Sequence, residues 1–333
     1  MWAMAATSDR VRVVLVTIAA VAQGVSGPLT TLALGPSSNT GAISDANASP
    51  VTPAGYAFGV WALIYAACLA LAVYQLLPSQ QERTVHRLTG WWLFGAFTAS
   101  ALWVPVFGTG AIWLSQILIV ILVVYLVIAA RAFLAVGPAA NTAEEILLRL
   151  PVMLYLGWAT VAAAAGFATT FRSWGMPASA RWVNEIGVVL VLSATIMSLF
   201  VVSRLVAVIG FLLTACWALL AVAVATDSNS VRNATVIAIV IILAAVVGRT
   251  LRSRNRRAVL LGRAIADRGL AAHFASVACT PHYLQLVPRS SNCCEVDEGS
   301  SAGDAIVEME RPIAESVLVQ QLEPHAYAVR QRW

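Results

Sequence analysis

Long apolar stretches without charges alternate with short polar connections through most of the chain. Between Pro53 and Pro78, about 24 consecutive residues carry no charge, and a helix of that length crosses a hydrocarbon layer of roughly 30 Å. The pattern predicts eight membrane-spanning helices of about 20 residues each. They are expected near residues 11–34, 54–77, 88–107, 111–133, 146–170, 183–203, 205–225 and 231–250. The apolar run from Ile186 to Thr226 is about twice the length of one crossing, so a tight turn is expected at Arg204.

The composition agrees with this pattern, because 59% of the residues are hydrophobic, 11% are charged and the mean hydropathy is +0.80. The expected fold class is therefore an all-α polytopic membrane protein. The 21 basic residues are all arginines, and the net charge is +5. Since most arginines lie at helix ends or after the last helix, the basic charge indicates contact with lipid headgroups, and no nucleic-acid partner is predicted.

The arginines also predict the orientation, because connections on the cytoplasmic side of a membrane carry an excess of basic residues. One set of connections holds thirteen arginines between Arg10 and Arg263, and the other set holds Arg172, Arg181 and Arg232. Both termini are therefore expected in the cytoplasm. The membrane is expected to be a bacterial plasma membrane.

Charged residues outside the spans are expected to face water or lipid headgroups. Glu144, Glu145 and Arg149 precede the fifth span and are interpreted as a solvated helix end, in which Glu145 and Arg149 pair at i and i+4. The arginine cluster that ends at Arg257 is expected to touch anionic lipid. The tail that follows is polar and of mixed charge, so we expect it to be disordered.

Aromatic residues lie at helical spacing in the second expected span. Phe58, Trp61 and Tyr65 fall at i, i+3 and i+7 and therefore share one face. Trp61 lies about two turns into the span, away from the headgroup level where membrane tryptophans usually sit. It either fills space between helices or forms one wall of an aromatic pocket.

A second aromatic pair lies in the fifth expected span. Tyr155 and Trp158 share a helical face with Ala162 and Ala165, so two rings stand beside a strip of small side chains. Small residues at four-residue spacing allow another helix to approach closely, or leave room for a ligand. Packing alone explains the alanines better than it explains a tyrosine and a tryptophan in the middle of a helix.

Three motifs carry a resemblance to a known family. They are P-x-G-x-x-F-x-x-W-x-x-x-Y from Pro53, L-W-x-P-V-F from Leu102 and P-x-x-x-Y-x-x-W-A-T-x-A-A from Pro151. In this order and spacing they resemble the TspO/MBR family, the tryptophan-rich sensory or translocator proteins, over residues 11–170. The segment from Tyr74 to Gln80 is similar to that of longer, eight-helix relatives in the family.

The resemblance implies a five-helix bundle whose pocket binds porphyrins and other hydrophobic ligands. Trp61 and Trp158 match the two pocket tryptophans of the family, and the other matched pocket positions are Tyr65, Trp103, Phe107 and Tyr155. The chain would then comprise a TspO-like bundle at 11–170, three additional helices at 181–250, and a basic segment with a tail at 251–333. Ser100 stands where many members have asparagine, and the connection after the first helix lacks their capping aromatic residues.

Three functions fit such a pocket: a sensor or receptor for a tetrapyrrole or similar ligand, a transporter of that ligand, and an enzyme that degrades porphyrin with help from tryptophan. The last three spans have no ionisable residue near mid-membrane, which weakens a proton-coupled carrier. The chain has no nucleotide loop or nucleophile triad, so no catalytic residue is assigned and an enzyme stays an alternative. Trp217, in the seventh span, is expected to stand apart from the pocket.

No resident cofactor is expected, and porphyrin or haem is regarded as a ligand. Cys279, Cys293 and Cys294, with two nearby histidines, lack the Cys-x2-Cys spacing that is usual for zinc ligands, so no metal site is predicted. Membrane lipids are the other expected contact. A homodimer is left open.

Overall fold

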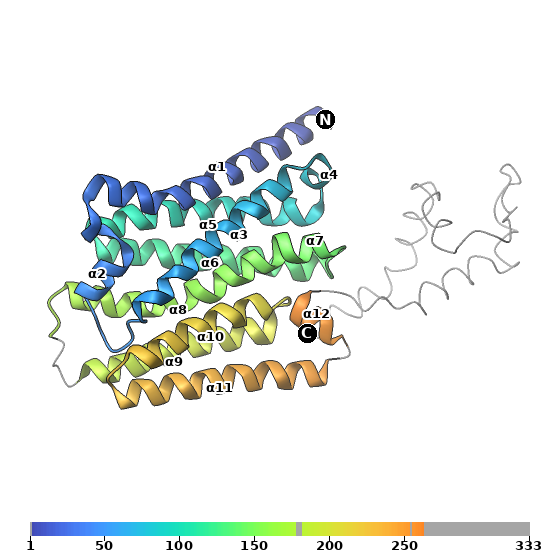
Figure 1. The fold of residues 1–333 in the computed structure, drawn as a ribbon. Coiled ribbons are helices and arrows are strands. Elements are labelled where there is room, and N and C mark those ends of the chain that lie inside the picture. Colours follow the sequence, from blue (N-terminus) through green and yellow to red (C-terminus); the bar gives the residue numbers. More distant parts are fainter. Residues whose placement is uncertain (1, 178–181, 254, 263–333) are drawn as a thin grey trace, which may run out of the picture. The chain divides into compact units, whose positions relative to one another are not determined.

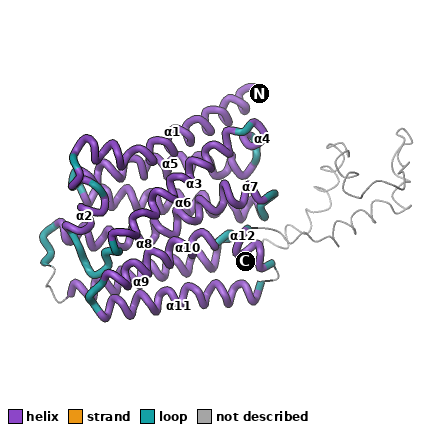
Figure 2. The backbone as a smooth tube through the Cα atoms, in the orientation of Figure 1, coloured by secondary structure: helices purple, strands orange, loops and turns teal. Residues whose placement is uncertain are grey.

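Figure 1 shows the computed structural model of the protein, which describes residues 2–177, 182–253 and 255–262. These residues form helices joined by short connections, and no strand occurs among them (Figure 2). Eight helices are long: α1 (Trp2–Leu34), α3 (Val60–Leu76), α5 (Thr84–Gly108), α6 (Ile112–Val136), α8 (Leu150–Ser173), α9 (Trp182–Arg204), α10 (Ile209–Ala225) and α11 (Asn229–Arg252). The connections contain the 3-10 turns Pro36–Ser38 and Gly55–Gly59, α2 (Thr40–Ala46), α4 (Pro78–Gln81), α7 (Thr142–Glu144), the π turn Glu145–Arg149 and α12 (Arg256–Leu261).

The eight long helices fall on the eight expected spans. Within the described residues, seven helical segments are long and apolar enough to cross a membrane, and the eighth helix, α10, has 17 residues. At 1.5 Å per residue α10 is roughly 25 Å long, slightly less than the hydrocarbon layer. The prediction of an all-α polytopic membrane protein is therefore confirmed. The main difference is that α1 begins at Trp2, before its expected span.

Successive long helices run in opposite directions, so the start of α1 and the end of α11 lie at the same end of the bundle (Figure 1). We call this end, which also holds α4, α7 and α12, the arginine end, and we call the opposite end the α2 end. The tight turn expected at Arg204 is present at the arginine end, where α9 stops and Ala207 takes a left-handed φ of 59°. Among the described arginines, Arg172 and Arg232 lie at the α2 end.

Helix α8 lies at the centre of the bundle, in contact with α3, α6, α9 and α10. Residues 151–161 of α8 are all buried, so this stretch exposes no face to lipid. The hydroxyl of Thr214 on α10 donates a hydrogen bond of 2.7 Å to the carbonyl oxygen of Leu154. Of the three additional helices, α9 and α10 therefore pack directly against α8, and α11 packs against α9 and α10.

The helix start at Glu144 and Arg149 is buried, which corrects the expectation of a solvated helix end. Arg149 donates to one carboxylate oxygen of Glu144 at 3.0 and 2.7 Å, and Arg83 donates to the other oxygen at 2.8 Å. The guanidinium of Arg149 also lies over the ring of Phe133. Gly262, which caps the end of α12, lies against this point, where a Cβ on Gly262 would lie 3.1 Å from the Arg149 side chain. The sequence pattern could not show this contact.

The arginine distribution predicts that the α2 end faces the outside of the cell. Ser37 and Ser79 are both exposed and lie at the α2 end and the arginine end, respectively. A membrane-impermeant thiol reagent added to intact cells should therefore label Ser37→Cys and miss Ser79→Cys, with the parent chain as the background. Labelling of Ser79→Cys from outside would reverse the predicted orientation.

The buried pair at the arginine end predicts a large effect on stability. Replacing Glu144 with glutamine would leave the Arg149 guanidinium buried without its counter-charge, and such a break typically costs about 3 to 5 kcal/mol. The thermal unfolding midpoint in detergent should fall for Glu144→Gln and recover in part when Arg149→Met is added. The exposed Glu82→Gln is the matched control and should leave the midpoint unchanged. Equal midpoints for Glu144→Gln and Glu82→Gln would contradict this account.

Candidate ligand pocket

Three helices bring aromatic side chains together towards the α2 end of the bundle. The ring of Trp61 on α3 stacks on Trp103 of α5 at a centroid distance of 5.3 Å. It also makes edge-to-face contacts with Tyr155 and Trp158 of α8, each at 5.9 Å. Tyr65, one turn further along α3, lies 5.4 Å from the same ring. Trp61 is therefore the hub of one aromatic cluster.

Two phenylalanines extend this cluster towards the α2 end. Phe107 stacks on Trp103 at 5.3 Å, and Phe58 packs edge-on against Trp158 at 6.1 Å. The structure thus brings together all six residues that the sequence analysis assigned to the pocket. Phe58, which the sequence analysis placed on the same helical face as Trp61, joins them.

The local sequence explains how these rings reach one another. The 3-10 turn Gly55–Gly59 leads directly into α3 and places Phe58 beside the first turn of that helix. Helix α8 has Pro151 as its second residue, just after the π turn Glu145–Arg149, and it continues unbroken through Tyr155 and Trp158. The side chains of Tyr155 and Trp158 are almost fully buried.

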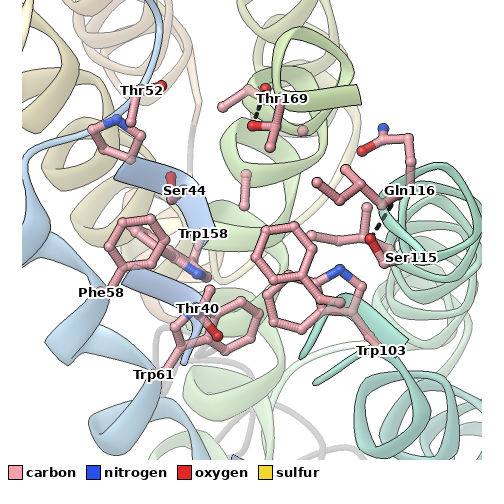
Figure 3. Close-up of a pocket in the computed structure, with 17 residues that line it drawn as sticks. Thr40, Ser44, Thr52, Phe58, Trp61, Trp103, Ser115, Gln116, Trp158 and Thr169 are labelled. Carbon is pink, nitrogen blue, oxygen red and sulfur yellow. Dashed lines mark hydrogen bonds between the residues drawn. The ribbon is translucent and has the colours of Figure 1, made fainter. Parts of the chain in front are cut away.

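A small cavity of about 50 Å³ lies beside the cluster, and Trp61, Trp103, Phe107 and Trp158 line it (Figure 3). Polar side chains line the cavity on its other sides. They come from α2, the connection before α3, α6 and α8, and include Thr40, Ser44, Thr52, Ser115, Gln116 and Thr169. The pocket therefore combines an aromatic wall with a ring of neutral hydrogen-bonding groups.

Tyr65 and Tyr155 are the two predicted residues that do not line this cavity. The Tyr65 hydroxyl lies 3.2 Å from the Ser100 hydroxyl, and the Tyr155 hydroxyl donates to the Gln23 side chain at 3.2 Å. These bonds join α3 to α5 and α8 to α1. In this structure the two tyrosines hold neighbouring helices together behind the tryptophans. Ser100, which stands where many family members have asparagine, is the hydrogen-bond partner of Tyr65.

Gln116 of α6 is a pocket residue that the sequence analysis missed. Its side-chain amide donates to the carbonyl oxygen of Ala163 at 2.9 Å. A Cβ on Gly166 would lie 2.2 Å from the Gln116 side-chain oxygen, so the glycine is what admits this side chain. Gln116 is the only side-chain amide in the largely apolar helix α6, and this isolated amide is the one signal that could have identified it.

The indole N–H groups of Trp61 and Trp158 are buried and have no hydrogen-bond partner among the described residues. Buried donors in proteins are nearly always paired, so each such group calls for an explanation. The two tryptophans contact each other at the edge of the cavity. Two unpaired donors at one cavity are a feature that tight packing alone does not explain.

The volume of the cavity sets a limit on what it holds in this state. Sites for drug-sized ligands typically measure about 300 to 1,000 Å³, and this cavity is close to the size of one or two water molecules. The rings of Trp61 and Trp158 touch edge to face, so no flat molecule fits between them here. The structure is therefore that of a closed pocket.

Trp217 does not stand apart from this region, in contrast to the sequence-based expectation. Its indole N–H donates to the carbonyl oxygen of Ala57 at 3.4 Å, and its ring packs edge-on against Tyr56. Periodicity along α10 could not show this contact, because it depends on how the connection before α3 folds. Trp217 therefore touches the turn that carries Phe58.

The described residues contain no group of three histidine, cysteine or acidic side chains placed to hold a metal ion. Cys68 and Cys216 lie within helices as free cysteines, and neither belongs to such a group. The cysteines and histidines of the tail, including Cys279, Cys293 and Cys294, lie outside the described residues. The expected disorder of the tail concerns the same undescribed stretch.

The fold and the pocket define the class of protein: a polytopic helical membrane protein with a buried aromatic pocket between its helices. The sequence model of a family described as TSPO-like protein matches residues 12–248, which is more than half of the chain. The chain therefore belongs to the TSPO-like protein family. No curated protein and no solved structure matches it. The matched region includes most of α11, so the additional helices fall within the family pattern.

Proposed function

We propose that this protein is a membrane receptor or sensor that binds a tetrapyrrole, or a similar flat hydrophobic ligand, at Trp61 and Trp158. The observation that carries the proposal is that Trp61 and Trp158 both line the cavity while their buried indole N–H groups have no hydrogen-bond partner among the described residues. A ligand with hydrogen-bond acceptors on a flat apolar body would satisfy both the donors and the ring faces.

Binding of such a ligand requires the closed cluster to open. The rings are held largely by ring–ring contacts, each worth about 0.5 to 1.5 kcal/mol beyond area burial, and a flat aromatic ligand can replace these contacts with its own. Ala162 and Ala165 line the cavity on α8, where no large side chain would block the movement of a ring. The pocket can therefore exchange internal stacking for stacking on a ligand.

The position of the cavity favours a receptor over a transporter of the same ligand. All its lining residues lie towards the α2 end, and the arginine end is closed by charged pairs. The Nε of Arg87 donates to the Oδ2 of Asp9 at 2.9 Å, and Arg12 donates to the Oδ1 of the same carboxylate. A transporter would have to break these pairs and the buried pair of Glu144 and Arg149 in each cycle.

A porphyrin-degrading enzyme is the third candidate. Among the described residues that line the cavity there is no carboxylate, histidine or cysteine, so light and the tryptophans would have to provide the chemistry. Two measurements on purified protein with protoporphyrin IX separate the candidates. Irreversible loss of absorbance in light that disappears in Trp158→Phe would favour the enzyme, and uptake of porphyrin into proteoliposomes would favour the transporter.

The proposal predicts that both tryptophans contribute to affinity. Replacing Trp61 or Trp158 with phenylalanine keeps an apolar ring but removes area and the unpartnered N–H. Binding of protoporphyrin IX should weaken by about 1 to 2 kcal/mol, or about five- to thirtyfold. Titration of the purified protein, followed by quenching of tryptophan fluorescence, measures the change.

Trp91→Phe is the matched control for this experiment. Trp91 lies near the arginine end of α5 and is 46% exposed, far from the cavity-lining residues. Its replacement should leave the dissociation constant unchanged. If Trp61→Phe and Trp158→Phe bind protoporphyrin IX as tightly as the parent and Trp91→Phe do, the proposed site is wrong.

A further inference from the structure

The connection that leads into the pocket is fastened to α10, one of the three additional helices. The backbone N–H of Ala54 donates to the carbonyl oxygen of Ala221 at 3.2 Å. The indole N–H of Trp217 donates to the carbonyl oxygen of Ala57, and the ring centroids of Trp217 and Tyr56 lie 5.6 Å apart. The turn before α3, which carries Phe58, is therefore held from outside the five-helix bundle.

A second cavity lies on the other side of the same connection. It has a volume of about 540 Å³ and is formed by residues within 45–55, the start of α9 at 183–184, and the turn between α10 and α11 at 225–228. We call this cavity the vestibule. Several of its lining residues, such as Asp45, Asn184 and Asp227, are exposed, so it opens to the surface at the α2 end.

Thr52 and Pro53 line both the vestibule and the tryptophan pocket. They therefore form the wall between the two cavities. Pro53 lacks a backbone N–H, and Ala54, the next residue, donates its N–H to the carbonyl oxygen of Ala221 on α10. The position of this wall thus depends on α10.

The two cavities differ in size and in chemistry. The vestibule falls within the range of about 300 to 1,000 Å³ that is typical of ligand sites, whereas the tryptophan pocket is far below it. Polar groups line much of the vestibule, among them Ser49, Asn184 and Thr226, and aromatic rings line the pocket. Side by side, the cavities match a ligand with a flat apolar body and a polar edge.

We propose that the additional helices build the mouth of the ligand pocket. The ligand reaches the tryptophans through the vestibule and past Thr52 and Pro53, and its polar edge stays among the vestibule groups. Trp217 is a positioning residue, because it acts on the ligand through the turn that it holds. This inference rests on the proposed function, and it assigns a role to α9, α10 and α11.

The first test blocks the vestibule without touching the tryptophan pocket. Asp227 lines the vestibule and Ser230, three residues further along, does not, and both are exposed. Asp227→Cys and Ser230→Cys are each treated with a bulky maleimide, and the treated parent accounts for its five native cysteines. The association rate of protoporphyrin IX, measured by stopped-flow fluorescence, should fall at least tenfold for labelled Asp227→Cys and stay at the parent value for labelled Ser230→Cys.

The second test addresses the positioning role of α10. Trp217→Phe keeps a ring against Tyr56 but loses the N–H, and Trp217→Leu loses both contacts. Affinity for protoporphyrin IX should fall in that order, by about tenfold for Trp217→Leu, with the unfolding midpoint measured in parallel. Leu213→Ala, at a position on α10 that is 57% exposed, should leave the affinity unchanged. If Trp217→Phe binds more tightly than Trp217→Leu while their unfolding midpoints are equal, the loss of affinity comes from positioning of the turn and not from a general loss of packing.

The outcomes distinguish this inference from the proposed function. If the parent binds protoporphyrin IX and Trp61→Phe weakens binding, equal association rates for the two labelled variants would overturn the vestibule route alone. Unchanged affinity in a folded Trp217→Leu would overturn the positioning role. If the parent does not bind protoporphyrin IX at all, both the proposed function and this inference fail.

Discussion

The close contact between α8 and α10 is the constraint on which the rest of the bundle depends. Helices gain little from the hydrophobic effect when they associate in lipid, so they need small residues that let their backbones approach. A Cβ on Gly157 would lie 2.3 Å from the carbonyl oxygen of Phe211, and Gly210 leaves similar room against the backbone of α8. The hydrogen bond from Thr214 to Leu154 closes the same contact. Larger residues at these glycines would separate the helices and displace everything that α8 carries.

This contact couples the pocket to the additional helices, because one side of α8 faces the pocket and the other side faces α10. Tyr155 and Trp158 face Trp61, while Leu154 and Gly157 face α10. A shift of α10 would therefore move Trp158, which lines the cavity, and also the turn before α3 that α10 holds. The five-helix bundle and the additional helices thus form one packed unit around α8, which agrees with a family match that extends to residue 248.

The spans and the pocket tryptophans could be predicted because their signals are local: hydrophobic length for the helices, and motif spacing for Trp61 and Trp158. The burial of Glu144 and Arg149 could not be predicted, because a charged helix start is interpreted as solvated unless the position of α12, much later in the chain, is known. The contact of Trp217 was missed for a related reason, since a tryptophan in a membrane helix faces lipid or protein equally well by its spacing. The closed state of the pocket depends on side-chain packing, which no sequence pattern encodes directly.

Under the proposed function, the closed cluster also bears on which ligands the pocket would select. A cavity walled by rings in a membrane protein gains by collapsing on itself, and stacking of Trp61 on Trp103 is the result. Collapse satisfies the ring faces but leaves the indole N–H groups of Trp61 and Trp158 without partners among the described residues. A ligand that offers only apolar surface replaces ring contacts with similar ones and gains little over the closed state. A ligand that also brings acceptors to the indoles gains what the closed state lacks. Opening the cluster lowers the apparent affinity of every ligand by the same factor, so hydrogen bonds to the indoles would favour flat ligands with acceptor atoms over plain hydrocarbons such as lipid chains.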